Sequence, residues 1–165
     1  MDIYLIRHGV PVELNKEIGD EGYRYLTVAG KNHCKVVAHK LKELKSEFDI
    51  MFSSPLVRAV QTAETFACVM KYTGEIKTAV ELIGGNTFSR FLQLIKRNSH
   101  YKSIAIFGHV PDVNTFSSGL IKNGDLKINF KNACVCKISY NIDTGEGQFE
   151  WFLDSESMKL VKDGI

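Results

Sequence analysis

The sequence lacks the features that would place it in a special class of protein. It has three prolines, no repeat and no low-complexity stretch, and no run approaches the ~18 to 20 apolar residues of a membrane span. An excess of charge is missing too, because 21 Lys and Arg face 19 Asp and Glu, for a formal net charge of +2. These absences exclude a disordered or collagen-like chain and any global attraction to nucleic acid or membranes. Any anion site must therefore be built locally.

The four cysteines have no spacing typical of a disulfide framework or a metal site. All of them lie within apolar patterns, as small hydrophobic residues do. The N-terminus carries an acid at Asp2 and stops being apolar after five residues, unlike a signal or transit peptide. We therefore expect a cytoplasmic protein.

What is present is an ordinary globular composition, 44% hydrophobic and 24% charged over 165 residues, which suffices for one full core. We expect residues 1–165 to form a single domain. Four short apolar runs, at 3–6, 49–52, 76–80 and 103–107, are predicted strands. They alternate with stretches of helical period, which is typical of βα units around a mainly parallel sheet.

Four helices are predicted from the stretches between and after these runs. The first begins after a cap at Thr27, and the second opens at Pro55 as a first-turn proline. The third spans Phe88 to Ile95, and the fourth follows Pro111. The second helix also carries a separate polar stripe of Arg58, Gln61, Thr62 and Thr65.

The last third of the chain changes character. Residues 122–132 are predicted to be a turn-rich connection, followed by a hairpin of strands at 133–140 and 148–153. Residues 158–165 are a helical turn or a tail. The predicted fold class is α/β, a three-layer α/β/α arrangement with a mainly parallel sheet of about six strands and one antiparallel edge strand.

Polar residues follow three of the predicted strands. Arg7 and His8 follow the first, Arg58 comes shortly after the second, and His109 follows the fourth. In open α/β sheets the ligand site lies beyond the carboxyl ends of the strands, so these four side chains are expected to converge. Singly, each has a simpler interpretation, such as a surface ion pair for Arg58 or a helix cap for His109. Their joint placement favours a site.

The residue types indicate an anion rather than a metal. Arg7 and Arg58 would repel a cation, and no Asp or Glu supplies a third ligand at a strand end. Arginine offers a planar fork suited to phosphate, and a neutral imidazole is a competent nucleophile. We therefore predict phosphoryl transfer through a histidine without metal or cofactor. Solvated or helix-end positions are predicted for the other histidines: His33, His39 and His100.

Several motifs, in order, resemble the histidine phosphatase superfamily, also called phosphoglycerate mutase-like. They are Arg7-His8-Gly9, Leu26-Thr27 with Gly30, the run 53–62 and Gly108-His109. The match spans nearly the whole chain. Within that superfamily the chain is similar to the small SixA-type phosphohistidine phosphatases. The resemblance implies a phosphoglycerate mutase-like fold.

The resemblance also implies a role for each matching residue. His8 would be the nucleophile that becomes phosphorylated. Arg7, Arg58 and His109 would hold the phosphoryl oxygens, and Arg24 would reach in from the loop at 9–25.

A general acid follows the third strand in many superfamily members. Glu81 lies near that place and is the candidate acid, with a structural or surface role as the alternative. An alkoxide leaving group needs a proton, whereas imidazole titrates near pH 6.5 and leaves readily. A weak or absent acid would therefore favour phosphohistidine as the substrate.

The predicted function is a phosphatase that acts on phosphohistidine in a signalling protein, such as a phosphotransfer domain. The alternatives are a broad phosphatase of small phosphorylated molecules and a non-catalytic module that binds a phosphorylated partner. Only about twenty residues, 81–100, link the third and fourth strands, so we expect an open cup without a lid. A monomer that binds neither nucleic acid nor membrane is expected.

Overall fold

The computed structural model describes residues 1–121, 124 and 126–162 of the chain. Strands and helices alternate through the first 120 residues, as the sequence predicts. The elements, with η for a 3-10 helix, are β1 (Asp2–Arg7), η1 (Glu21–Tyr23), α1 (Val28–Glu43), β2 (Ile50–Ser53), α2 (Val57–Met70), β3 (Ile76–Thr78), η2 (Val80–Leu82), α3 (Phe88–Arg97), β4 (Ser103–Gly108), α4 (Asp112–Leu120), β5 (Val135–Asn141), β6 (Glu146–Leu153) and β7 (Leu160–Val161).

The named strands form one sheet in the order β3-β2-β4-β1-β5-β6-β7. The pairs β1–β4, β2–β4 and β2–β3 are parallel, because a helical crossover separates each of these strands from the next. β5 to β7 continue the sheet with antiparallel pairings. The predicted fold class is confirmed, but the described residues form a sheet of seven strands rather than about six, and its antiparallel part exceeds one edge strand.

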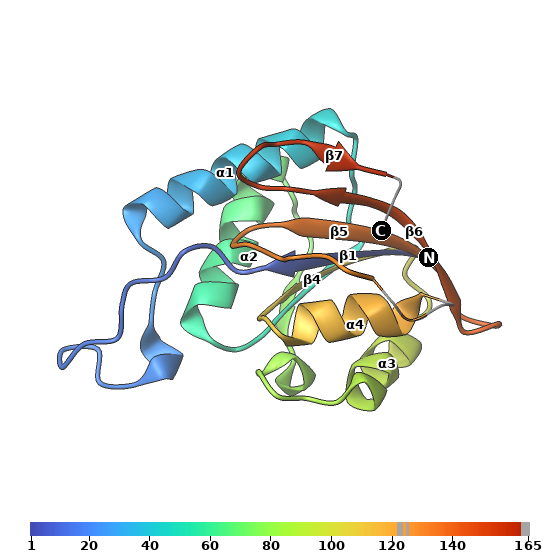
Figure 1. The fold of residues 1–165 in the computed structure, drawn as a ribbon, viewed down its shortest axis with the longest axis horizontal. Helices are drawn as coiled ribbons and strands as arrows, with labels where there is room; N and C mark the ends of the chain where they lie inside the picture. Colours follow the sequence, from blue (N-terminus) through green and yellow to red (C-terminus); the bar gives the residue numbers. More distant parts are fainter. Residues whose placement is uncertain (122–123, 125, 163–165) are drawn as a thin grey trace.

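Two helical layers cover the sheet (Figure 1). α1 and α2 pack on one face, and α3 and α4 pack on the other. The central strand β1 serves both cores, because successive side chains of a strand point to opposite faces. Ile3 and Leu5 belong to the α3/α4 core, and Tyr4 and Ile6 belong to the α1/α2 core.

The helix starts test two of the predictions. Thr27 caps α1, and its hydroxyl accepts a hydrogen bond from the Gly30 N–H at 2.8 Å, as predicted. The prediction that Pro55 opens the second helix is wrong, because α2 begins at Val57. Leu56, the N-cap, has extended dihedral angles and places Pro55 before the helix.

The C-terminal third contains the predicted hairpin, β5–β6, and resolves the tail that the sequence left open. Residues 160–161 add the short strand β7 beside β6. The predicted connection at 122–132 falls partly outside the described residues, as do positions 163–165. In the part of the chain that is described, no helix has the length and apolarity needed to cross a bilayer.

Candidate active site

The carboxyl ends of three neighbouring strands hold the predicted residues in register. β2, β4 and β1 lie side by side, so Ser53, Gly108 and Arg7 end at one edge of the sheet. The ladder continues one residue further, because the His8 N–H donates to the Gly108 carbonyl at 3.0 Å and the Ser54 N–H to the Phe107 carbonyl at 2.9 Å. The backbone of the site is therefore an extension of the sheet.

A cavity of about 470 Å³ lies at this edge, and we call it the site cavity. It contains five of the six predicted site residues, from β1, the arm at 9–25, α2 and the end of β4. Glu81 is not among its lining residues. The lining is Arg7, His8, Val10, Pro11, Glu13, Glu21, Arg24, Arg58, His109, Val110 and Asn132.

The His8 ring is buried and held in one tautomer. Its Nδ1 lies 2.7 Å from the Gly9 carbonyl oxygen, which can only accept a hydrogen bond, so Nδ1 carries the proton. Burial lowers the pKa of His8 to about 3, and the positive charges of Arg58 and Arg7 act in the same direction. The ring is therefore neutral at pH 7, and its Nε2 has a lone pair.

Side chains from distant parts of the chain position the backbone at Gly9. The Gly9 N–H donates to the Thr62 hydroxyl at 3.0 Å, and the Asn132 amide donates to the carbonyls of His8 at 3.0 Å and Gly9 at 3.3 Å. Thr62 belongs to the polar stripe of α2. That stripe therefore faces the loop that follows β1.

The second histidine lies beside the first. The ring centroids of His8 and His109 are 5.0 Å apart, and the planes are tilted by 56°. His109 Nε2 makes a 2.8 Å hydrogen bond with the Ser54 hydroxyl. Burial lowers the pKa of His109 to about 4, with further contributions from Arg58 and Arg7, so this ring is also neutral at pH 7.

Three arginines surround the two histidines. Arg7 donates to the Phe130 carbonyl at 2.8 Å, and Arg58, only 7% exposed, donates to the Glu21 carbonyl at 2.7 Å. Arg24 lies on the arm and donates from Nε to the Val12 carbonyl at 2.7 Å. Desolvation lowers the pKa of Arg7 and of Arg58, yet both guanidinium groups stay charged at neutral pH.

Two polar atoms of the site are left unpaired. Within the described residues, Arg7 Nε and His109 Nδ1 are buried without a hydrogen-bond partner. Each such atom costs about 1–3 kcal/mol of stability. Buried unpaired polar groups are rare in folded proteins, and a catalytic role is one of the explanations for them.

Glu81 lies away from the site cavity. Its carboxylate accepts a hydrogen bond from Arg97 at 2.5 Å, and this bond lowers its pKa. The other three histidines also lie away from the lining. His39 and His100 are exposed, as predicted, whereas His33 is half-buried with its Nε2 2.7 Å from the Ser155 carbonyl oxygen.

Three residues of the site were given no role by sequence reasoning. Ser54 lies within the motif at 53–62 but had no predicted role of its own, and Asn132 and Glu21 belong to no motif. The one local signal is the spacing of Glu21 and Arg24, because an acid and a base three residues apart can pair on one helical turn. Within the described residues, no group of three or more His, Cys, Asp or Glu side chains could hold a metal ion.

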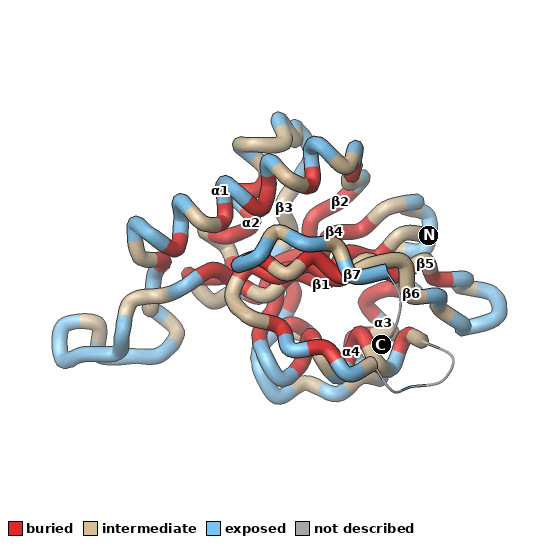
Figure 2. Tube along the Cα trace, turned by 45° about the horizontal axis from the view of Figure 1, so that its top comes forward, coloured by how far each residue is buried: buried red, intermediate tan, exposed pale blue. Residues whose placement is uncertain are grey.

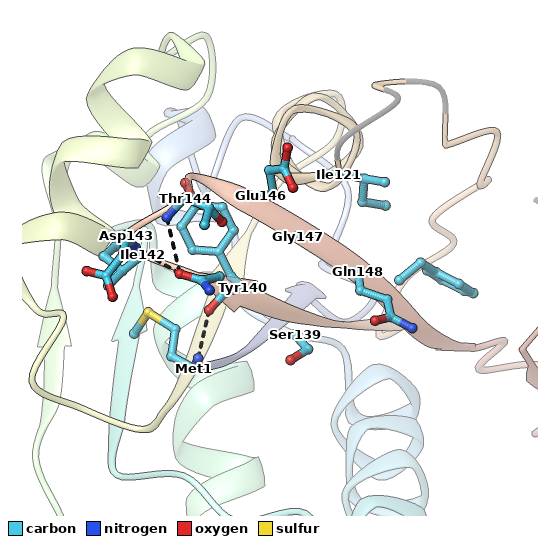
Figure 3. A pocket seen from close by; sticks show the side chains of 12 residues that line it. Met1, Ile121, Ser139, Tyr140, Ile142, Asp143, Thr144, Glu146, Gly147 and Gln148 are labelled. Carbon is cyan, nitrogen blue, oxygen red and sulfur yellow. Dashed lines mark hydrogen bonds between the residues drawn. The ribbon is translucent and has the colours of Figure 1, made fainter.

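A second hollow lies at the opposite end of the sheet (Figure 3). It has a volume of about 1000 Å³ and is lined by Met1, Ile121 and the turn of the β5–β6 hairpin. The Met1 ammonium donates to the Tyr140 carbonyl at 2.7 Å. None of the predicted site residues lines this hollow.

The sequence is similar to those of known phosphatases. The model of the histidine phosphatase superfamily (branch 1) matches residues 3–82. Phosphohistidine phosphatase SixA of Escherichia coli is 24% identical over 165 residues, covering 98% of this chain and 99% of that protein.

Two solved structures show the same fold. The structure of the protein histidine phosphatase SixA complexed with tungstate has a TM-score of 0.88 at 22% identity, covering 96% of this chain and 100% of that one. The alpha-ribazole phosphatase of Shigella flexneri has a TM-score of 0.71 at 16% identity, covering 90% and 94%.

Proposed function

We propose that this chain, which belongs to the histidine phosphatase superfamily and is a phosphatase, works through a phosphohistidine formed on His8. Its substrate is phosphohistidine on another protein. The observation that carries the proposal is the state of the His8 ring. The ring is neutral, its Nδ1 is fixed by the Gly9 carbonyl, and its Nε2 is available among three arginines.

The arginines bind the phosphoryl group in this proposal. Arg7, Arg24 and Arg58 line one cavity with the two histidines, and guanidinium groups pair with phosphate oxygens in a bidentate way. A bound dianion also raises the pKa of His109, because an opposite charge nearby favours the protonated ring. His109 then donates a hydrogen bond to a phosphoryl oxygen.

The reaction has two in-line steps. His8 Nε2 attacks phosphorus, and the bond from phosphorus to the leaving nitrogen breaks, so that the phosphoryl group moves to His8. Water then attacks the phosphorus, the bond to Nε2 breaks, and inorganic phosphate and neutral His8 result. The arginines stabilise the equatorial oxygens in both steps.

The position of Glu81 supports the choice of substrate. The candidate acid is paired with Arg97 and does not line the site cavity, so we assign it no step. The imidazole of a phosphohistidine leaves as a neutral ring when its other nitrogen carries a proton. Such a leaving group does not require an acid from the enzyme, whereas an alkoxide does.

A broad small-molecule phosphatase is the second candidate. The shared fold with an alpha-ribazole phosphatase favours it, and the cavity lies open at the edge of the sheet. A non-catalytic phosphate-binding module is disfavoured, because anion capture does not need a neutral histidine in a fixed tautomer.

The test compares wild type with His8→Ala on a phosphohistidine-bearing phosphotransfer domain, an aryl phosphate and a sugar phosphate. We expect the phosphoprotein to be hydrolysed with the highest kcat/KM. In His8→Ala, kcat/KM should fall by at least about a thousandfold. His39→Ala, which changes an exposed histidine outside the cavity, is the control.

Radioactive phosphoramidate followed by an alkaline quench should label wild type and leave His8→Ala unlabelled. Turnover by His8→Ala at the wild-type rate would refute the assignment of His8 as the nucleophile. A preference for the sugar phosphate would select the second candidate.

We also propose a location, an oligomeric state and a domain extent for this protein. We place the protein in the cytoplasm as a monomer, and we assign the activity to one domain over residues 1–165. All four cysteine thiols are free, which fits a reducing compartment.

A further inference from the structure

An acidic side chain occupies part of the arginine cluster in the site cavity. The Glu21 carboxylate accepts hydrogen bonds from Arg24 Nη1 at 2.8 and 3.1 Å, and it lies 3.4 Å from Arg58 Nη2. Glu21 also lines the cavity itself. Two of the three arginines that would bind a phosphoryl group are therefore already paired with an internal anion.

We propose that Glu21 is an internal competitor for phosphate. In the free enzyme its carboxylate holds Arg24 and Arg58, and an incoming phosphoryl group must displace it to reach both guanidinium groups. The inference rests on the proposed function, since it needs phosphate to bind at these arginines. Glu21 would weaken the binding of the product and thereby speed its release.

The backbone allows this exchange without loss of the loop. Arg58 Nη1 donates to the Glu21 carbonyl at 2.7 Å, and Asp20 accepts from the Gly22 N–H at 2.6 Å. These bonds hold η1 in place when the side chain moves away. The Glu21 side chain is 53% exposed, so its carboxylate can turn into water without a large desolvation cost.

Glu21 lies on an arm, residues 9–25, that extends from the body of the protein. Residues 9–25 leave the sheet as an extended excursion, pale blue and tan in Figure 2, and return to start α1. Near its base the arm is paired through Val12 and Tyr25, whose N–H and carbonyl are 2.8 Å apart. Further out, Arg58 of α2 contacts Glu21 of the arm through both the carbonyl and the carboxylate of Glu21.

The charges also favour competition rather than simple anchoring. Arg58 is 8% exposed at its side chain, and an unpaired buried guanidinium is costly, so the enzyme without ligand gains from an internal counter-charge. A phosphoryl dianion carries more charge and more acceptor oxygens than a carboxylate. The phosphoryl group therefore displaces the Glu21 carboxylate from the arginines when it binds. The cost of that displacement lowers the net affinity for phosphate.

The experiment measures the binding of inorganic phosphate, and of tungstate as a second tetrahedral oxyanion, by calorimetry. The variants are Glu21→Gln and Glu13→Gln. Gln keeps an oxygen that can accept from Arg24 and removes only the charge. Glu13 lines the same cavity, and the ion pairs of the described residues do not join it to either arginine, so its variant controls for charge alone.

We expect Glu21→Gln to bind phosphate roughly three- to tenfold more tightly, and Glu13→Gln to change the Kd by less than about twofold. The inhibition constant of phosphate in turnover should fall by the same factor. Thermal melting checks that both variants fold.

Three outcomes would overturn the inference: weaker phosphate binding by Glu21→Gln, unchanged binding by Glu21→Gln, or equal tightening by Glu13→Gln. Weaker binding would mean that Glu21 only anchors the loop. The proposed function fails separately. If His8→Ala keeps its activity while Glu21→Gln tightens phosphate binding, Glu21 is a competitor for phosphate but His8 is not the nucleophile. Absence of phosphate binding in every variant would overturn both.

Discussion

Burial, more than any neighbouring charge, keeps the His8 ring neutral. Only 7% of the residue is exposed, and the ordinary pKa of about 6.5 would leave a quarter of such rings protonated at pH 7. Desolvation lowers the pKa to about 3, and the adjacent arginines add to the effect. The arginines proposed to bind phosphate therefore also help burial to keep the proposed nucleophile unprotonated.

The first prediction concerns this protonation state. In ¹⁵N NMR spectra, the His8 ring should show a protonated Nδ1 and an unprotonated Nε2 throughout pH 5 to 8, because its pKa lies near 3. His8→Gln, which lacks the ring, assigns the resonances. A titration of the His8 ring between pH 6 and 7 would contradict the burial argument.

The second prediction concerns Ser54. Its substitution by alanine removes the hydrogen bond to His109 Nε2 and leaves both ring nitrogens without a described partner. We expect about 1–3 kcal/mol lower unfolding free energy and roughly tenfold lower kcat/KM. Ser53→Ala is the matched control, since Ser53 is equally buried but donates to the Ser54 carbonyl. A comparable fall in kcat/KM for both variants would exclude a specific effect through His109.

At the scale of elements, two helices on one face of the sheet hold the loop that follows β1. Thr62 of α2 accepts from the Gly9 N–H, and Gln61 of α2 accepts from the Leu26 N–H at 2.7 Å. The first turn of α1 meets the same loop, because a Cβ on Gly30 would lie 2.3 Å from the Val10 carbonyl oxygen. The site therefore depends on close approach between α1 and the backbone beyond His8.

The third prediction follows from this contact. Gly30→Ala should cost about 1–3 kcal/mol of stability and lower kcat by more than tenfold, because the clash is with backbone and moves Val10. Urea unfolding and steady-state kinetics measure the two effects. Gly84→Ala is the control, since a Cβ there meets no atom within 4 Å. Tolerance of alanine at position 30 would show that the loop can yield.

At the scale of the whole molecule, burying two histidines couples the site to the stability of the fold. His8 and His109 have pKa values of about 3 and about 4 in the folded protein, below the unfolded value of about 6.5. Between roughly pH 4 and 6.5 the unfolded chain thus binds more protons than the folded one. Stability rises with pH in this window and is lost as the pH falls through it.

The fourth prediction is the size of this dependence. Each buried histidine should contribute about 1.4 kcal/mol per pH unit to the slope of unfolding free energy between pH 4.5 and 6. His8→Gln and His109→Gln should each remove that share, and His39→Ala, an exposed position, should not. Denaturant unfolding at several pH values measures the slopes. Equal slopes in all four proteins would contradict native-state neutrality of the rings.

The sequence by itself determined, to within one residue, where β1, β2 and β4 end and which residues follow them, whereas the third predicted strand, 76–80, ends at Thr78. Short apolar runs end where buried backbone gives way to polar side chains, so the sequence alone places Arg7, His8 and His109 at one edge of the sheet. The order of the motifs along the chain is also read from the sequence alone, and it carried the resemblance to the histidine phosphatase superfamily. Local signals also located the cap at Thr27, because a capping hydroxyl acts within three residues.

Tertiary structure decided the short strand β7, the start of α2 and the positions of Glu81 and Glu21, because these features depend on contacts between residues far apart in the chain. Strand β7 has only two residues, which is too short to show a periodicity, and the start of α2 depends on how Leu56 leaves the sheet. Only folding separates Glu81 from the cavity and brings Glu21 to Arg58, 37 positions away. Spacing along the sequence can place a charge near a strand end, but the geometry of packing determines which counter-charge it meets.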